Sequence, residues 1–179
     1  SATPSARLKS TLLHSLAELP GVYVPSLYRP IYRTDGALSG AAPISDGLPP
    51  RITRAIVPQL TAAPVRPIVP TIRVVHDRAA VEIQRGCSHG CRFCQAGMVY
   101  RPIRERPTEE VLSLIDQVIA NTGYNEVGLV SLSSSDHSGI QQIVTQTMAR
   151  YAERRLSVSL PSLRIDSFSV KLAESIQQS

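Results

Sequence analysis

The sequence predicts an α/β domain preceded by an extended arm, and one feature of its pattern supports each part. From about residue 80, short apolar segments typical of β-strands alternate with longer segments that have the spacing of amphipathic helices. Before that point, eleven of the fourteen prolines fall within residues 1–70, which limits regular structure there. We therefore expect an N-terminal helix and a proline-rich extended arm over residues 1–79, followed by an α/β domain over residues 80–179.

Composition and charge narrow the classes of function. The 179 residues are 42% hydrophobic, contain no run of eighteen apolar residues and have no charged start followed by an apolar stretch. We expect a cytoplasmic protein without membrane contact. The net charge is +5, and 17 of the 19 basic residues are arginine, as in many proteins that bind nucleic acid. These arginines are scattered among acids, and the chain has no Trp. Nucleic acid is therefore a possible partner that the sequence does not support.

The first 79 residues contain one helical pattern and several turn signals. The helix is expected from Ser5 to Glu18 and should end at Pro20-Gly21. Its apolar residues recur at helical spacing: Leu8, Leu12, Leu13, Leu16 and Leu19. The sequences TDG at 34–36 and SDG at 45–47 predict turns. The arm is too apolar for a free linker, so we expect it to pack on a neighbouring surface.

The strands and helices expected after residue 80 alternate in order. Strands are predicted over 80–84, 126–132 and 156–160, and helices over 108–120 and 139–154. In the first helix, Thr108 is expected to cap the N-terminus and Asn121-Thr122-Gly123 to end it. A further helix is expected to begin near Ser167.

This alternation favours parallel strands joined by right-handed crossovers. Three strand–helix units form only part of a closed barrel, and the chain lacks an initial methionine and stops inside a predicted helix. We expect a fragment whose missing part would complete the sheet, with an open three-stranded layer as the alternative.

All three cysteines lie in one short stretch, EIQRGCSHGCRFCQAG, directly after the first predicted strand. Their spacing is C-x3-C-x2-C, at Cys87, Cys91 and Cys94. An odd number of clustered cysteines argues against a disulfide framework. Thiolates are the usual ligands of iron–sulfur clusters, and loops at the carboxyl ends of strands are where α/β proteins build their sites. Three ligands would leave one iron of a 4Fe-4S cluster open, with Gly86 and Gly90 shaping the loop.

Two other interpretations of the cysteines stay open at this point. In the first, a structural zinc ion takes His89 or His76 as its fourth ligand, and the protein is a metal-binding module without catalytic activity. In the second, the thiols are inert core residues. The absence of a second ligand pair argues against zinc, and the glycines around the thiols argue against inert packing.

The motif Cys87-x3-Cys91-x-Phe93-Cys94 after a first strand resembles the signature of radical S-adenosylmethionine (SAM) enzymes. The longer string VHDRAAVEIQRGCSHGCRFCQAGMVYRPIRERPTEEV looks like a subgroup that carries a cobalamin-binding-like domain before the catalytic barrel. The string LPGVYVPSLYRP looks like the segment that joins those two domains. The cobalamin-binding signature Asp-x-His-x-x-Gly is not present in this chain. The resemblance implies the N-terminal portion of a (β/α)6 partial TIM-like barrel, about three βα units long, preceded by the extended arm.

The resemblance also implies a chemistry. Cys87, Cys91 and Cys94 would hold a 4Fe-4S cluster whose fourth iron binds the methionine part of SAM. Reductive cleavage of SAM would then give a 5'-deoxyadenosyl radical that abstracts hydrogen from an unknown substrate, in an oxidoreductase or a transferase. Phe93 would pack near the adenine, or serve as an ordinary core aromatic. The electron donor would be of flavodoxin or ferredoxin type, and the full-length protein could also carry cobalamin.

Two further sets of residues are implied by position. The loop after the second strand, which in this family holds the methionine amino group, contains Ser133, Ser134, Ser135 and Asp136 in place of the usual Gly-Gly-Glu. The alternative is a serine-rich turn in which Asp136 or Ser138 caps the next helix. After the third strand, Arg164 would pair with the SAM carboxylate, or lie on the surface.

Overall fold

The computed structural model describes residues 4–72 and 74–164, which group into two compact units that divide between Val57 and Pro58. The grouping concerns spatial contacts, and the domain boundary predicted after residue 79 stays a prediction. The helix expected from Ser167 lies outside the described residues. Among the helices of the described part, none combines the length and the hydrophobicity that crossing a membrane requires.

The first unit contains helix α1 (Pro4–Ala17), a short 3-10 helix (Pro25–Leu27) and an antiparallel hairpin of β1 (Tyr28–Tyr32) and β2 (Leu38–Pro43). The predicted helix is confirmed, and so is the turn at 34–36, where Gly36 has φ +81. The hairpin was not predicted, because Pro30 and the small residues of LSGAAP weaken the strand signal. The small core of this unit consists of Ala17, Val24, Leu27 and Tyr28.

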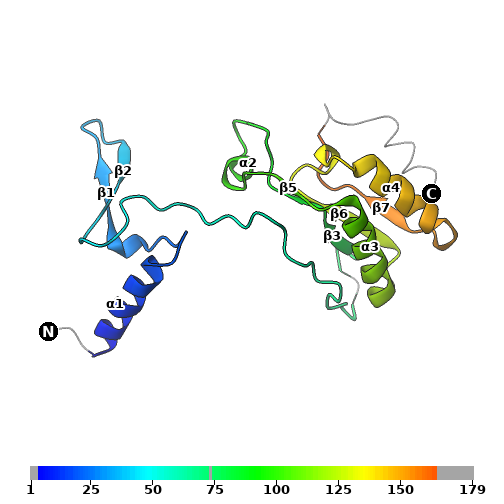
Figure 1. The fold of residues 1–179 in the computed structure, drawn as a ribbon, viewed down its shortest axis with the longest axis horizontal. Coiled ribbons are helices and arrows are strands. Elements are labelled where there is room, and N and C mark those ends of the chain that lie inside the picture. The colour runs from blue at the N-terminus through cyan, green and yellow to red at the C-terminus, as the bar shows by residue number, and fades with distance from the viewer. Residues whose placement is uncertain (1–3, 73, 165–179) are drawn as a thin grey trace. The chain divides into compact units, whose positions relative to one another are not determined.

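The second unit is built on a three-stranded parallel sheet in the order β3-β6-β7 (Figure 1). Its strands are β3 (Ala79–Glu82), β6 (Glu126–Val130) and β7 (Ser157–Ser159). In the register, Ala79 pairs with Val127, which in turn pairs with Val158. The prediction of an α/β fold with a parallel sheet is confirmed. The number of strands beyond β7 and the closure of a barrel stay predictions.

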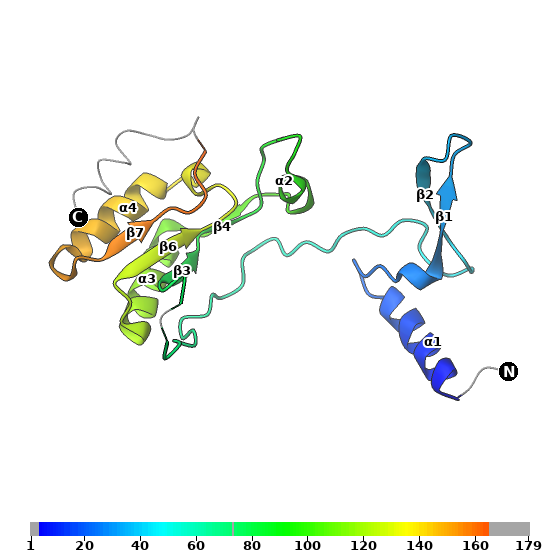
Figure 2. The same ribbon diagram turned by 180° about the vertical axis from the view of Figure 1, so that it is seen from behind.

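Helices α3 (Thr108–Thr122) and α4 (Ile140–Arg150) join these strands and lie on one face of the sheet (Figures 1 and 2). Several boundaries differ from the prediction: for example, β6 ends at Val130 rather than at residue 132, and β7 spans Ser157–Ser159 rather than residues 156–160. The first strand is interrupted at Ile83, and a short strand β4 (Gln84–Arg85) follows it. Helix α4 ends at Arg150, and a 3-10 turn (Ala152–Arg154) follows, closed by Arg155 at φ 49.

The ends of α3 test two predictions. Gly123 terminates the helix in the left-handed conformation, with φ +74, and donates to the carbonyl of Ile119, as expected. Thr108 is not the N-cap, which contradicts the prediction. Pro107 occupies that position and makes no side-chain cap bond. The side chain of proline offers no acceptor, so the acids Glu109 and Glu110 in the first turn are the favourable side-chain feature left at this helix end.

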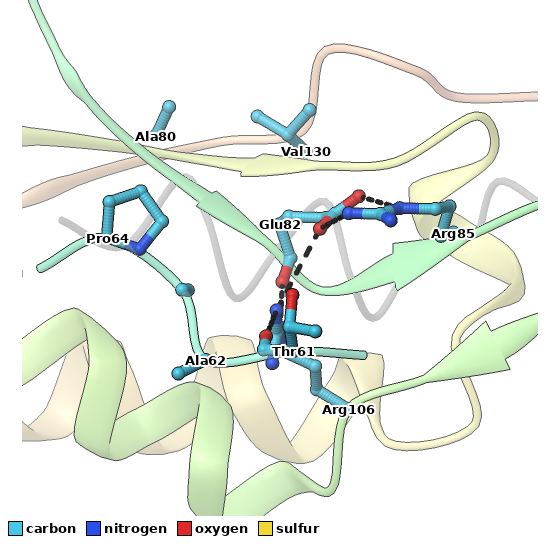
Figure 3. Close-up of a pocket in the computed structure, with 9 residues that line it drawn as sticks. Thr61, Ala62, Pro64, Ala80, Glu82, Arg85, Arg106 and Val130 are labelled. Atoms are coloured by element: carbon cyan, nitrogen blue, oxygen red, sulfur yellow. Dashed lines mark hydrogen bonds and ion pairs between the residues drawn. The ribbon is translucent and has the colours of Figure 1, made fainter. Parts of the chain in front are cut away.

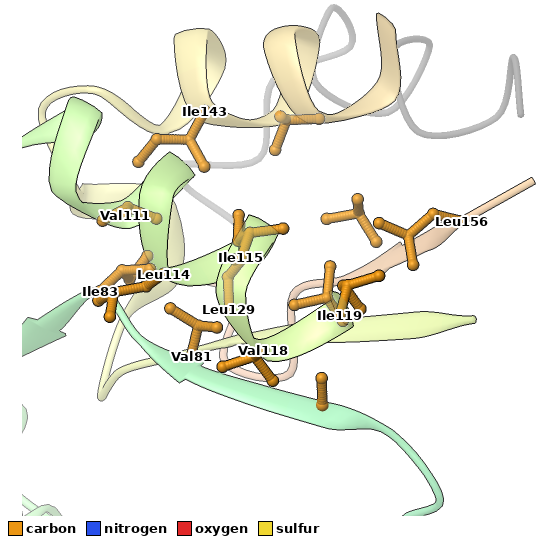
Figure 4. Close-up of a cluster of buried hydrophobic side chains, with 14 of the residues drawn as sticks. Val81, Ile83, Val111, Leu114, Ile115, Val118, Ile119, Leu129, Ile143 and Leu156 are labelled. Carbon is orange, nitrogen blue, oxygen red and sulfur yellow. The ribbon is translucent and has the colours of Figure 1, made fainter. Parts of the chain in front are cut away.

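The main core lies between the sheet and the two helices (Figure 4). Alternate residues of each strand point into it, as a strand with one covered face requires. It consists of strand residues Ala79, Val81, Val127, Leu129 and Val158, and of helix residues Val111, Leu114, Ile115, Val118, Ile119, Ile140, Ile143 and Val144, together with Ile83 and Leu156. The other face of the sheet carries Ala80 and Val130, which are exposed among the described residues.

Part of the proline-rich arm packs on this unit. Ala63 and Val65 are partly buried against the core, and two side chains hold the backbone beside them. Arg106 Nη2 donates to the carbonyl of Thr61 at 2.8 Å, and Asn121 Nδ2 donates to the carbonyl of Val65 at 2.8 Å. The expectation that the arm packs on a neighbouring surface is therefore confirmed for residues 61–65.

Tyr151, which follows α4, gives this unit a predicted sensitivity to alkali. Its hydroxyl donates to Asp116 Oδ1 at 2.7 Å, and burial together with this carboxylate raises its pKa to about 12. The folded state therefore holds the proton more tightly than the unfolded state, whose tyrosine titrates near 10. The stabilisation is complete below pH 10 and is lost as the pH rises through 12.

We expect Tyr151→Phe to lower the free energy of unfolding by about 1 kcal/mol at pH 8. Between pH 10 and 12, the difference between the two proteins should shrink, because Tyr151 ionises in the unfolded wild-type protein while the folded protein still holds its proton. Urea denaturation at pH 8 and at pH 11 checks this. A difference that stays constant over this range would contradict the assigned pKa.

Candidate functional site

The three cysteines lie on a loop whose base is closed by a small antiparallel ribbon. Strand β4 pairs with β5 (Arg104–Glu105), so that Gln84 faces Glu105 and Arg85 faces Arg104. We call residues 86–103 between them the Cys loop. It contains the short helix α2 (Gln95–Val99) and leaves the sheet near the carboxyl end of β3. The predicted position of the cysteines, on a loop after the first strand of the parallel sheet, is what the structure shows.

All three thiols are free, and the backbone of the loop is folded around them. Cys87 is buried, while Cys91 and Cys94 are partly buried. The amide of Cys94 donates to the carbonyl of Cys91 at 3.0 Å. Cys94 is also the N-cap of α2, and its sulfur accepts from the amide of Gly97 at 3.4 Å.

Gly86 and Gly90, both expected to shape the loop, differ in their constraints. Gly86 has φ +91, and a Cβ there would collide with the carbonyl oxygens of Tyr100 and Pro102. At Gly90 a Cβ would meet nothing closer than Arg101 Nη2 at 3.9 Å, which is ordinary contact. The prediction therefore holds for Gly86, and the geometry of Gly90 does not require glycine.

Side chains from the three strand ends meet at the Cys loop. His89 Nε2 and Asp136 Oδ2 lie 2.6 Å apart, which joins the loop to the segment after β6. Arg164, after β7, donates from Nη1 to the sulfur of Cys91 at 3.3 Å. Arg164 is partly buried in this contact, and the choice between the role at the SAM carboxylate and that of a surface arginine stays a prediction. Asp136 and Arg164 thus lie beside the cysteines, as carboxyl-end loops of parallel strands should.

The serines after β6 are mostly engaged within their own turn. Ser134 is buried, and its hydroxyl donates to the carbonyl of Leu129 at 2.9 Å. Ser133 is also buried, and its hydroxyl oxygen has no hydrogen-bond partner among the described residues. Ser135 is partly buried. Ser133 is therefore the serine whose hydroxyl is left over for another group.

Neither Asp136 nor Ser138 caps helix α4, which contradicts the alternative interpretation of this turn. Gly139 is the N-cap, and its amide donates to Nδ1 of His137 at 3.0 Å. Asp136 contacts His89 through its Oδ2 atom, while the hydroxyl of Ser138 donates to Glu105 Oε2 at 2.5 Å. Both side chains thus tie this segment to the Cys loop and its base rather than to the helix.

Phe93 lies on the surface of the Cys loop, where its side chain is 93% exposed. The alternative that it is an ordinary core aromatic is therefore wrong. The expected role beside an adenine stays a prediction.

The described residues contain no group of three His, Cys, Asp or Glu side chains placed to hold a metal ion. The chemistry of the donors still fits an iron–sulfur cluster, because three unpaired thiols share one loop with an amide donor at the third. Of the two histidines considered as a fourth zinc ligand, His89 has its Nε2 engaged by Asp136. His76 is exposed.

Two arginines and an ion pair near the site were missed by the sequence analysis. Arg101 contacts the Cys loop backbone, and Arg106 is buried between β3, α3 and the arm. Glu82 and Arg85 form a bidentate pair with both contacts at 2.8 Å, and this carboxylate raises the pKa of Arg85. An arginine-rich sequence offers no local signal that separates such residues from surface arginines.

The Glu82–Arg85 pair and Arg106 line a cavity of about 260 Å³ beside the arm (Figure 3). Thr61, Ala62 and Pro64 of the arm form one wall, and Ala80 and Val130 of the uncovered sheet face form another. The arm therefore contributes to the surroundings of the strand ends from which the Cys loop departs.

Comparison with known protein families decides the relationship. The family model described as the radical SAM superfamily matches residues 81–179, more than half of the chain.

The chain belongs to the radical SAM superfamily.

Two proteins illustrate the similarity beyond the family model. An uncharacterised protein of Methanocaldococcus jannaschii is 33% identical over 63 residues, which cover 35% of this chain and 14% of that protein. The threonylcarbamoyladenosine tRNA methylthiotransferase MtaB of Treponema pallidum is 27% identical over 115 residues, which cover 59% of this chain and 24% of MtaB. The matched part thus spans less than a quarter of the length of either relative.

Membership of the radical SAM superfamily implies an enzyme that uses a 4Fe-4S cluster and SAM. The match begins at Val81 in β3 and includes the whole Cys loop, the segment after β6 and Arg164. The residues that the structure brings together at the strand ends therefore all lie within the matched region.

Proposed function

We propose that this chain forms part of a catalytic barrel that cleaves SAM reductively and uses the resulting radical to abstract hydrogen from a substrate. The observation that carries the proposal is the placement of three free thiols, Cys87, Cys91 and Cys94, on one loop at the carboxyl end of a parallel sheet. The family model that matches this region supports the same chemistry.

In this proposal the three thiolates hold the cluster. When bound, the cluster would supply one electron to the sulfonium of SAM. The amide of Gly97 stabilises the charge on Cys94, and the guanidinium of Arg164 does the same for Cys91 at 3.3 Å. These donors compensate part of the negative charge that three adjacent thiolates bring together.

The residues around the thiols would hold the amino-acid part of SAM. The hydroxyl of Ser133 is an acceptor for an ammonium group, because it has no partner among the described residues. Ser134, Ser135 and Asp136 would shape the same wall, with Asp136 held by His89. Arg164 would also face the SAM carboxylate, and the exposed ring of Phe93 would cover the adenine.

The whole protein would extend this core. We propose that further βα units complete a (β/α)6 partial TIM-like barrel and that a cobalamin-binding-like domain precedes it. The electron donor would be of flavodoxin or ferredoxin type, and the protein would be cytoplasmic. Of the two classes, oxidoreductase and transferase, similarity to a methylthiotransferase favours transferase chemistry on a substrate still to be identified.

Anaerobic reconstitution with iron and sulfide tests this function. We expect a brown, oxygen-sensitive protein that binds the cluster and, on reduction, converts SAM to 5'-deoxyadenosine. Cys91→Ala should lose the colour and the cleavage entirely, because two protein thiolates hold a 4Fe-4S cluster poorly. Ser88→Ala, an exposed position on the same loop, is the matched control and should keep both.

A colourless protein that holds one tightly bound zinc ion would instead support a metal-binding module and would overturn the proposal. In this proposal the whole barrel encloses SAM, so the cleavage assay is made on the full-length protein. Cluster assembly is measured on this chain and on the full-length protein.

A further inference from the structure

One arginine of the Cys loop has a role that none of the assignments above includes. We propose that Arg101 is a positioning residue that fastens the two halves of the Cys loop together and so sets the positions of Cys87, Cys91 and Cys94. The inference rests on the proposed function, because that function supplies the cluster that the ordered loop would bind. Its evidence is a set of contacts within the chain itself.

The guanidinium of Arg101 contacts backbone within the cysteine motif and just after it. Its Nη2 donates to the carbonyls of Ser88 and His89, each at 3.1 Å. Its Nε donates to the carbonyl of Gly97 at 2.9 Å. The first two carbonyls lie between Cys87 and Cys91, and the third lies three residues after Cys94. One planar group therefore spans the motif from its first half to the helix that follows it.

Gly97 lies where these two segments approach each other closely. A Cβ at this position would lie 3.2 Å from the carbonyl oxygen of His89 and 3.7 Å from the sulfur of Cys94. Without a side chain, α2 can lie against the backbone of residues 88–89. This brings the carbonyls of His89 and Gly97 within reach of a single guanidinium.

Arginine suits this position for a geometric reason. Its guanidinium presents five N–H donors in a rigid plane, so separate nitrogens can bind carbonyls in different directions at once. A lysine ammonium places its donors around one atom and cannot reproduce that spacing. The contacts are therefore specific to arginine, and the loss of its fork should release one half of the loop from the other.

A loop that is already shaped loses less conformational entropy when it binds its ligand. The three acceptors of Arg101 are backbone carbonyls and none of its three contacts involves a thiol, so these contacts can order the loop before cluster assembly. The expected consequence is faster cluster assembly and slower iron loss than a loosely held loop would allow.

We call the three contacts of Arg101 with the backbone of the Cys loop the clamp. Hydrogen exchange on the metal-free protein tests the clamp directly. In Arg101→Gln and Arg101→Lys we expect amides of residues 88–98 to exchange about tenfold faster than in the wild-type protein. Amides of α3 and β6, which belong to the core, should exchange at the wild-type rate. After anaerobic reconstitution, both variants should lose iron faster to a competing chelator.

Arg92 offers the matched control, because it is an exposed arginine on the same loop. Arg92→Gln and Arg92→Lys should leave loop exchange and iron retention unchanged. If Arg101→Gln unfolds, seen as faster exchange in α3 and β6, then Arg101→Lys decides. Faster exchange confined to the loop supports the clamp. Unchanged exchange, or loss of protection throughout the second unit, overturns it.

The two proposals fail in different ways. A wild-type protein that never assembles a cluster would contradict the proposed function. Faster hydrogen exchange of the Cys loop in the Arg101 variants would still support the clamp. Arg101 variants whose loops exchange like the wild type would sink the clamp even if the cluster assembles and SAM is cleaved.

Discussion

Gly86→Ala is expected to abolish cluster binding while leaving the sheet folded. Gly86 adopts φ +91, where an L-residue with a side chain is strained, and its Cβ would collide with the carbonyls of Tyr100 and Pro102. The strain alone costs about 2 kcal/mol, and the collisions force the returning segment of the Cys loop away from Cys87. Because Cys87 is the adjoining residue, its thiol should move out of register with the other two.

The expected measurement is iron and sulfide content after anaerobic reconstitution, together with circular dichroism to confirm that the α/β unit is folded. Gly90→Ala is the matched control, since its new Cβ would come no nearer than 3.9 Å to any described atom outside its chain neighbours. It should retain wild-type iron content. Equal loss in both variants would mean that the loop tolerates no added methyl group and that the backbone conformation of Gly86 is not the cause.

The sequence allowed prediction of the features that depend on local patterns. Helix α3 has an apolar stripe and a terminating glycine, so its existence and its end at Gly123 followed directly. The alternation of strands and helices was likewise enough to predict the parallel sheet. The hairpin of β1 and β2 was missed because its stabilising contacts are cross-strand pairs, which leave little trace in strands that contain Pro30 and Gly40.

The site was predictable to the extent that its residues are close in sequence. The spacing of Cys87, Cys91 and Cys94 identified the loop from the sequence. The contact of His89 with Asp136 joins residues 47 positions apart, and that of Arg164 with Cys91 joins residues 73 positions apart. Contacts of this kind depend on the order of the strands in the sheet. The family resemblance predicted a role for Asp136 and Arg164, but not their partners.

The role of Arg106 shows most clearly why buried charges escape sequence analysis. In the sequence it is one arginine of RPIRERP, yet its side chain is 2% exposed. Its Nε donates to the carbonyl of Glu82 at 2.9 Å, and its Nη1 pairs with Glu110 at 2.5 Å. With the bond to the carbonyl of Thr61, it joins strand β3, helix α3 and the arm. These partners come from three separate segments, so no local pattern reveals them.

Arg106→Met is therefore expected to lower the free energy of unfolding of the second unit by about 3 kcal/mol. Methionine fills much of the buried volume but leaves the carbonyls of Glu82 and Thr61 without their donor, and buried acceptors without partners are costly. The arm should also detach locally, because Arg106 and Asn121 both donate side-chain hydrogen bonds to its backbone there, and the variant loses the first of these. Urea denaturation measures the first effect, and thermolysin cleavage near Leu60 and Val65 measures the second.

Arg85→Met is the matched control for this prediction. Arg85 pairs with the carboxylate of Glu82 at 2.8 Å, but its side chain is 44% exposed. Water can replace an exposed partner, so its removal should cost less than about 1 kcal/mol and leave the arm resistant to thermolysin. Similar losses in the two variants would show that the burial of Arg106 contributes nothing beyond its charge. A stable Arg106→Met protein with a cleavable arm would mean that Arg106 docks the arm without supporting the core, because the two measurements report on different partners of the same guanidinium.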